Sequence, residues 1–220
     1  MRSSKKNLLL LAVAVAGAFA ALFGLVMFNI HLLNSFTLSL HMILVIVTQW
    51  SLFLVPGVLM LVNKESFKIF GFTGKRLLKQ ILIGIGIAAA MSAVLTVLPI
   101  LLEARYMVGS TDYTQAWQFA FEFAYTILGV ALAEELLFRG YIFHKLLDIK
   151  NNKTFAIIIS SALFGLFHVF TGAPLQILMT ALIGAFYCLC REKIKDCTIL
   201  SLIVAHGVYD ALIVLWVGIL

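Results

Sequence analysis

The sequence predicts an all-α protein, a polytopic transmembrane helix bundle of about seven spans. Hydrophobic residues make up 63% of the chain and charged residues only 12%, and the mean hydropathy is +1.08. A soluble domain of 220 residues has no need for so much apolar surface. The apolar runs are long and continuous rather than alternating, which favours helices over a membrane barrel. We expect one integral-membrane domain covering residues 1–220.

Seven apolar runs are long enough to approach the thickness of a bilayer core. The first follows a basic N-terminus but is too long for a signal peptide, so we expect it to be retained as a span. We expect Pro56 to bend the second run, and the aromatic and basic stretch 63–80 to lie along the membrane interface. The predicted spans are residues 8–30, 41–62, 81–102, 117–147, 154–170, 174–190 and 198–220.

The basic residues predict the orientation. All lysines and arginines except Arg105 and Arg139 lie in the N-terminus or in the loops after the second, fourth and sixth spans. Cytoplasmic loops carry such an excess, so we expect the N-terminus inside and the C-terminus outside. A multi-pass protein of a bacterial plasma membrane fits this pattern. The charges are dispersed, which indicates contact with the lipid bilayer rather than with nucleic acid.

The three cysteines lie near the predicted cytoplasmic face, where thiols stay reduced. We interpret them as small apolar residues, because an odd number of cysteines without a matching histidine cluster makes a poor zinc site. They are Cys188, Cys190 and Cys197.

Three charged residues lie inside the fourth predicted span. Glu134, Glu135 and Arg139 each carry an insertion cost of about 2.5–3.5 kcal/mol if ionised at the bilayer centre, so such groups are usually paired or functional. Glu135 and Arg139 are four residues apart and share a helix face, which predicts an ion pair. Glu134 is rotated by about 100° from Glu135 and is left free for chemistry.

Further polar residues lie in the fifth and seventh spans. His168 follows Phe164 by four residues, and Asp210 follows His206 by four, so each pair shares a helix face. At a rise of about 1.5 Å per residue, Glu134, His168 and Asp210 all lie roughly 20 Å from the cytoplasmic ends of their helices. We therefore expect these groups to meet at one level, with the ring of Phe164 forming a wall beside His168.

These groups suit hydrolysis. Glu134 can act as general base on a water, and His168 can hold or share the proton of that water. His206 and Asp210 can face the oxyanion that forms when water attacks a carbonyl. An ionised Asp210 would repel that oxyanion, so it must be protonated, orient His206, or contact the substrate amide.

The same residues resemble a known family. The resemblance is to the CPBP family, the CAAX proteases and bacteriocin-processing enzymes also called Abi proteins, which include the Ras-converting enzyme. It covers residues 119–220 and rests on three segments in order, Glu134-Glu135-x-x-x-Arg139, Phe164-x-x-x-His168 and His206-x-x-x-Asp210.

The resemblance implies an intramembrane endopeptidase of the glutamate type. In that reading Glu134 is the catalytic base, His168 activates the water with it, and His206 with Asp210 stabilises the oxyanion. Glu135 and Arg139 are structural or assist binding. Many family members have asparagine where Asp210 stands. The substrates implied are prenylated C-terminal motifs, bacteriocin leaders and peptide pheromones. From the short outer loops and the cationic inner loops we expect the substrate to enter from the cytoplasmic side.

Two other function classes stay open at this point. Intramembrane acids and histidines also form proton relays in ion-coupled transporters, although no inverted repeat is apparent. A bacteriocin-immunity membrane protein would keep the fold and not need Glu134. Within the peptidase class, a glutamate and two histidines can also bind zinc, but no His-Glu-x-x-His string is present. We favour a site without metal or other cofactor.

Overall fold

The computed structural model describes residues 2–170 and 172–220, and within these ranges all regular secondary structure is helical. The predicted all-α class is therefore confirmed. Five stretches of the described chain are long and apolar enough to cross a membrane: Ser4–Ser35, Leu38–Val62, Leu77–Leu101, Pro174–Lys193 and Ile199–Ile219. The other two predicted spans are helical as well, but each departs from a regular membrane helix.

The N-terminal half contains three of the five long stretches. The first is α1 (Arg2–His31), followed by the short η1 (Leu33–Ser35). The second consists of α2 (Leu38–Gln49), η2 (Trp50–Phe53) and α3 (Leu54–Val62). The third consists of α4 (Leu77–Ser92), η4 (Ala93–Val97) and α5 (Leu98–Leu101). The 3₁₀ turn η2 lies just before Pro56, where a proline disturbs the preceding helical turn.

The fourth span is an unbroken helical rod with two wide segments. It consists of α6 (Ala116–Tyr125), η6 (Thr126–Ala131), α7 (Leu132–Glu135), η7 (Leu136–Ile142) and α8 (Phe143–Ile149). The segments η6 and η7 are π-helical, a rare form that is frequent at functional sites. The sequence predicts the rod but not these segments. They enclose the four residues of α7, which carry both acids.

The last three helices complete the bundle. They are α9 (Lys153–Leu166), α10 (Pro174–Lys193) and α11 (Ile199–Ile219). The predicted fifth span is too long, because α9 ends at Leu166 and residues 167–170 form a turn. Pro174 begins α10 as predicted, while Thr171 of the predicted turn lies outside the described residues.

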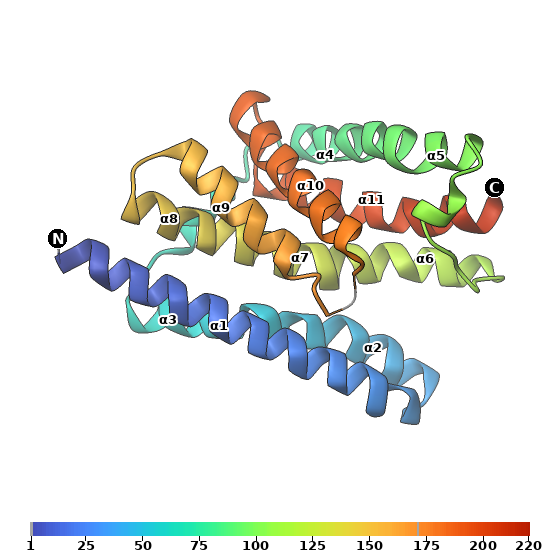
Figure 1. Ribbon diagram of the computed structural model, residues 1–220, viewed down its shortest axis with the longest axis horizontal. Coiled ribbons are helices and arrows are strands. Elements are labelled where there is room, and N and C mark those ends of the chain that lie inside the picture. Colours follow the sequence, from blue (N-terminus) through green and yellow to red (C-terminus); the bar gives the residue numbers. More distant parts are fainter. Residues whose placement is uncertain (1, 171) are drawn as a thin grey trace.

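The rod α6–α8 lies at the centre of the bundle (Figure 1). On one side α1 packs against α3, η2 and α8, and on the other α11 packs along α4 and η6. The hairpin α9–α10 crosses the rod, and its tip lies part of the way along the long axis rather than at the end (Figure 1). This hairpin therefore brings the end of α9 beside the middle of the rod.

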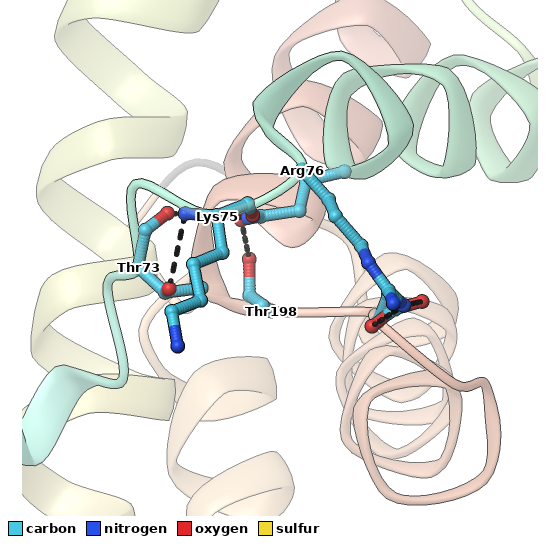
Figure 2. A pocket seen from close by; sticks show the side chains of 6 residues that line it. Thr73, Lys75, Arg76 and Thr198 are labelled. Atoms are coloured by element: carbon cyan, nitrogen blue, oxygen red, sulfur yellow. Dashed lines mark hydrogen bonds and ion pairs between the residues drawn. The ribbon is translucent and has the colours of Figure 1, made fainter.

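The basic loops gather at one end of the bundle. The Nζ atom of Lys79 lies 2.6 Å from a carboxylate oxygen of Asp196, and that of Lys145 lies 2.6 Å from one of Glu65. The N-terminus lies at the same end (Figure 1). A small pocket there is lined by Thr73, Lys75, Arg76, Gln80, Asp196 and Thr198 (Figure 2). This arrangement agrees with the grouping of loops that the distribution of charge predicts.

The stretch expected along the interface is partly docked into the core. Its 3₁₀ turn η3 (Phe67–Phe70) buries Phe70 completely, while Phe67 stays exposed. The ring of Phe70 packs against Phe53 at 5.8 Å between centroids. It also lies so close to Gly140 that a Cβ there would be 2.6 Å from Phe70 Cδ1. The segment is thus anchored directly on η7.

Candidate active site

The predicted ion pair on the rod is present. The Nη1 atom of Arg139 lies 2.9 Å from Oε1 of Glu135, and both side chains are buried. The guanidinium of Arg139 also stacks on the Phe164 ring, 4.1 Å from its centroid. Buried charges of this kind need a partner, because removing one leaves the other unpaired in a low dielectric. Arg139 and Glu135 therefore neutralise each other's charge inside the bundle, while Nη2 of Arg139 and Oε2 of Glu135 have no described hydrogen-bond partner.

His206 is held between carboxylates. Its Nδ1 atom lies 2.9 Å from Oε1 of Glu135, and its Nε2 atom lies 3.3 Å from Oδ2 of Asp210 and 3.9 Å from Oε2 of Glu134. An ionised carboxylate oxygen can only accept a hydrogen bond. Both ring nitrogens therefore act as donors in this arrangement, which fits a positively charged imidazole. The helix α11 brings Asp210 to the same face as His206, as their spacing predicts.

The two adjacent acids have different surroundings. The oxygen Oε1 of Glu135 accepts from both Arg139 and His206. Glu134 is 8% exposed, and its Oε2 atom has no hydrogen-bond partner among the described residues. Oε2 of Glu135 also lacks a described partner, so the two acids differ in that Glu135 is held by Arg139 and His206 through Oε1. The contact between Glu135 and His206 was missed, because the sequence assigned Glu135 to Arg139 alone.

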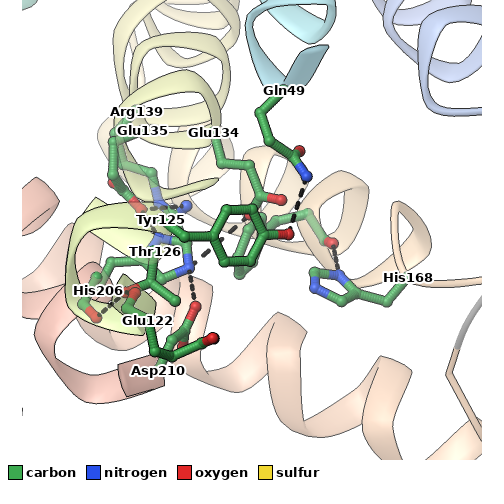
Figure 3. A network of polar contacts seen from close by, with 12 residues as sticks. Gln49, Glu122, Tyr125, Thr126, Glu134, Glu135, Arg139, His168, His206 and Asp210 are labelled. Atoms are coloured by element: carbon green, nitrogen blue, oxygen red, sulfur yellow. Dashed lines mark hydrogen bonds and ion pairs between the residues drawn. The ribbon is translucent and has the colours of Figure 1, made fainter. Parts of the chain in front are cut away.

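His168 lies just after the end of α9. Its Nδ1 atom lies 3.0 Å from the main-chain oxygen of Phe164, and the rings of these two residues meet edge to face at 5.2 Å. If Nδ1 donates to that carbonyl, Nε2 is left with a lone pair. The imidazole points toward the region that holds Glu134 and His206 (Figure 3). The predicted wall formed by Phe164 is present, and the same ring also faces His206 at 5.9 Å.

The N-terminal half contributes a polar side chain that sequence reasoning left out of the site. Gln49, on α2, donates from Nε2 to the Tyr125 hydroxyl oxygen at 3.1 Å. Gln49 is buried, and an amide within an apolar span was the signal available in the sequence. Glu122 accepts a hydrogen bond from the Tyr113 hydroxyl at 2.8 Å.

Within the described residues, no three side chains of histidine, cysteine, aspartate or glutamate are grouped so that they could hold a metal ion. The three cysteines are free and buried. The site thus consists of carboxyl, imidazole, guanidinium and aromatic groups, drawn from the rod, α9 and α11.

The fold and the site define a polytopic membrane protein with a buried cluster of acids and imidazoles. Residues 116–212 match the family model described as type II CAAX prenyl endopeptidase Rce1-like. This part of the chain, which carries the site, is therefore similar to the CAAX-type membrane endopeptidases of the CPBP family, the family that the sequence pattern predicted. The match includes all four candidate catalytic residues, Glu134, His168, His206 and Asp210. No curated protein and no solved structure matches the chain.

Proposed function

We propose that the protein is an intramembrane endopeptidase that hydrolyses a peptide bond in a membrane-proximal or lipidated peptide. CAAX-type processing is the favoured activity, because the matched domain is described by that substrate class. The maturation of bacteriocin or pheromone peptides would use the same hydrolysis of a peptide bond on a different class of substrate. The observation that carries the proposal is the position of Glu134: its Oε2 has no hydrogen-bond partner among the described residues and lies 3.9 Å from His206 Nε2, whereas Oε1 of the adjacent Glu135 accepts from both Arg139 and His206.

In this mechanism Glu134 removes a proton from water as the water oxygen attacks the peptide carbonyl carbon. The electron pair of the carbonyl double bond moves to its oxygen, which becomes an oxyanion. When that double bond forms again, the carbon–nitrogen bond breaks and the proton held by Glu134 passes to the amine nitrogen. The products are a carboxylic acid and an amine. His168 orients the attacking water through its Nε2 lone pair.

His206 stabilises the negative charge of the oxyanion. A donor that is fixed before the reaction stabilises developing charge more effectively than water does. Glu135 accepts from Nδ1 and so fixes both the ring orientation and the positive charge of His206. Of the three roles open to Asp210, the distance of 3.3 Å to His206 Nε2 favours orientation of that ring.

We further propose that the protein resides in a bacterial plasma membrane and that substrate reaches the site from the cytoplasmic side. The support is the cluster of basic loops at the end of the bundle where the N-terminus lies (Figure 1). Cytoplasmic loops are the ones enriched in lysine and arginine. An anionic leaflet on that side would attract the same residues.

A cleavage assay tests the proposal. Purified protein in lipid nanodiscs is given a fluorescence-quenched farnesylated CAAX peptide, the same peptide without the lipid, and bacteriocin-leader peptides. We expect cleavage by the parent and a loss of about 10²–10⁴-fold in Glu134→Gln. Glu122→Gln, on the same rod, is the matched control and should keep its activity. Equal cleavage by Glu134→Gln and the parent, or no cleavage of any peptide by the parent, would refute the proposal.

The same assay tests whether cleavage depends on a metal ion. We expect unchanged cleavage in the presence of a chelator. Loss of activity that added zinc restores would show that Glu134 and the histidines act as zinc ligands instead.

A further inference from the structure

The hydroxyl of Tyr125 has a defined hydrogen-bond orientation. The Nε2 group of Gln49 can only donate, so the hydroxyl oxygen of Tyr125 accepts that hydrogen bond at 3.1 Å. The phenolic hydrogen is then left to find an acceptor, and none is present among the described residues. The Tyr125 side chain is partly buried, so this hydrogen is available to a group that enters the site.

The free hydrogen lies on the side of the reactive acid. The Tyr125 hydroxyl lies near the Glu134 carboxyl in Figure 3. The Oε2 atom of Glu134 is itself a buried acceptor with no described partner. A donor without a described acceptor and an acceptor without a described donor thus belong to the same part of the site.

The π-helical segment accounts for this placement. Tyr125 and Glu134 are nine residues apart, and nine residues of regular α-helix advance by about 900°, which would put them on opposite faces of the rod. The segment η6 lies between them, and its wider turns rotate the chain by less per residue. The two side chains can then point to the same side of the rod.

We propose that Tyr125 is a further catalytic residue, whose hydroxyl, oriented by Gln49, donates a hydrogen bond to the oxyanion. This inference rests on the proposed function. Three carboxyl groups surround His206, and an ionised carboxylate offers no donor to an oxyanion. Asp210 cannot supply the donor that an asparagine amide would supply at its position. The neutral hydroxyl of Tyr125 provides that donor from the opposite side, and Gln49 acts as its positioning residue.

The test measures kcat and KM separately on a peptide that the parent cleaves, beginning with the farnesylated CAAX peptide. We expect Tyr125→Phe to lower kcat about 10²–10³-fold, the effect of losing one oxyanion donor, with KM unchanged. Gln49→Leu leaves the hydroxyl in place without its orientation and should lower kcat by a smaller factor. Tyr141→Phe is the matched control, because the Tyr141 hydroxyl is also buried on the rod without a described partner.

The outcomes separate this inference from the proposed function. A parent that cleaves no peptide refutes the proposed function and the inference together. A parent that cleaves, with Tyr125→Phe equally fast, refutes the inference alone. A rise in KM with kcat unchanged in Tyr125→Phe also refutes the inference alone. The same holds if Tyr141→Phe loses as much kcat as Tyr125→Phe. Thermal unfolding checks that each variant is folded. If Tyr125→Phe does not fold, Gln49→Leu decides, and an unchanged kcat in that variant overturns the inference.

Discussion

The Nδ1 atom of His206 lies 2.9 Å from Oε1 of Glu135, the acid next to the proposed catalytic base. The same oxygen accepts from Arg139, so a single carboxylate oxygen connects the rod to α11. This contact explains how two adjacent glutamates can differ in role. Glu135 fixes the ring that faces the reaction, and Glu134 keeps an oxygen free.

The buried pair should dominate the stability of the site. We expect Arg139→Leu to lower the free energy of unfolding by about 3–5 kcal/mol, because the buried Glu135 would keep only His206 of its two cationic partners. The measurement is reversible unfolding of the purified protein in mixed micelles. Lys153→Met is the control, since the pair of Lys153 with Glu192 is exposed on the lysine side and should contribute at most about 1 kcal/mol. Equal costs for the two variants would contradict this account.

The side chain at position 210 should act by orienting His206. We expect Asp210→Asn to keep cleavage within about tenfold of the parent, because the amide oxygen can still accept from Nε2 and the amide nitrogen adds a donor. Asp210→Leu has neither an acceptor nor a donor in its side chain and should lower kcat about 10²–10³-fold. Parallel cleavage assays check this. If the two variants are equally impaired, orientation of His206 is not what Asp210 provides.

Gly140 should be required for docking the η3 segment. A Cβ there would lie 2.6 Å from Phe70 Cδ1, so we expect Gly140→Ala to destabilise the protein by about 1–3 kcal/mol through overpacking. Unfolding measurements on Gly140→Ala, Phe70→Leu and the double variant check this. The double variant should be more stable than the sum of the single effects predicts, because the two residues touch.

The control for that experiment is Gly86→Ala in α4. No atom lies within 4 Å of a Cβ added at Gly86, so this change should be neutral or stabilising by up to about 1 kcal/mol. Additive effects of Gly140→Ala and Phe70→Leu would show that the contact carries no strain.

The ion cluster at the basic end should make stability depend on acid pH. Hydrogen bonds from Lys79 and then Arg76 hold the pKa of Asp196 below its usual value of 3.8. A lowered pKa in the folded state contributes stability above the unfolded value, and this contribution is lost as the pH falls through the folded pKa. The Tm of the parent should therefore fall further between pH 6 and about pH 3 than the Tm of Asp196→Asn. Parallel Tm curves would contradict the assignment.

The fold was largely predictable because its main signals are local. The helices were predicted from long apolar runs and from the positions of prolines. The placement of lysines predicted that the basic loops share one end of the bundle. The spacing of Glu135 and Arg139, and of Phe164 and His168, gave contacts that the structure contains. Each of these depends on a single helix face, which sequence periodicity describes well.

Other parts of the site depend on contacts between distant segments. Gln49 meets Tyr125 across 76 positions of sequence, and no local pattern relates them. The double use of Glu135 by Arg139 and His206 could not be inferred from spacing on one helix. The π-helical segments are also not encoded in the hydrophobic pattern, so the sequence does not show which residues upstream of α7 share a face with Glu134.

The segment η6 has a consequence for comparing this chain with its relatives. Because its wide turns set the rotation of α6 against α7, removing one residue from Thr126–Ala131 would turn Tyr125 and Glu122 away from the acids without shortening the rod by more than about 1.5 Å. In a relative whose equivalent of η6 is one residue shorter or longer, residues at the same alignment position lie at different angles around the rod. Equivalent side chains should therefore be identified by their angular position.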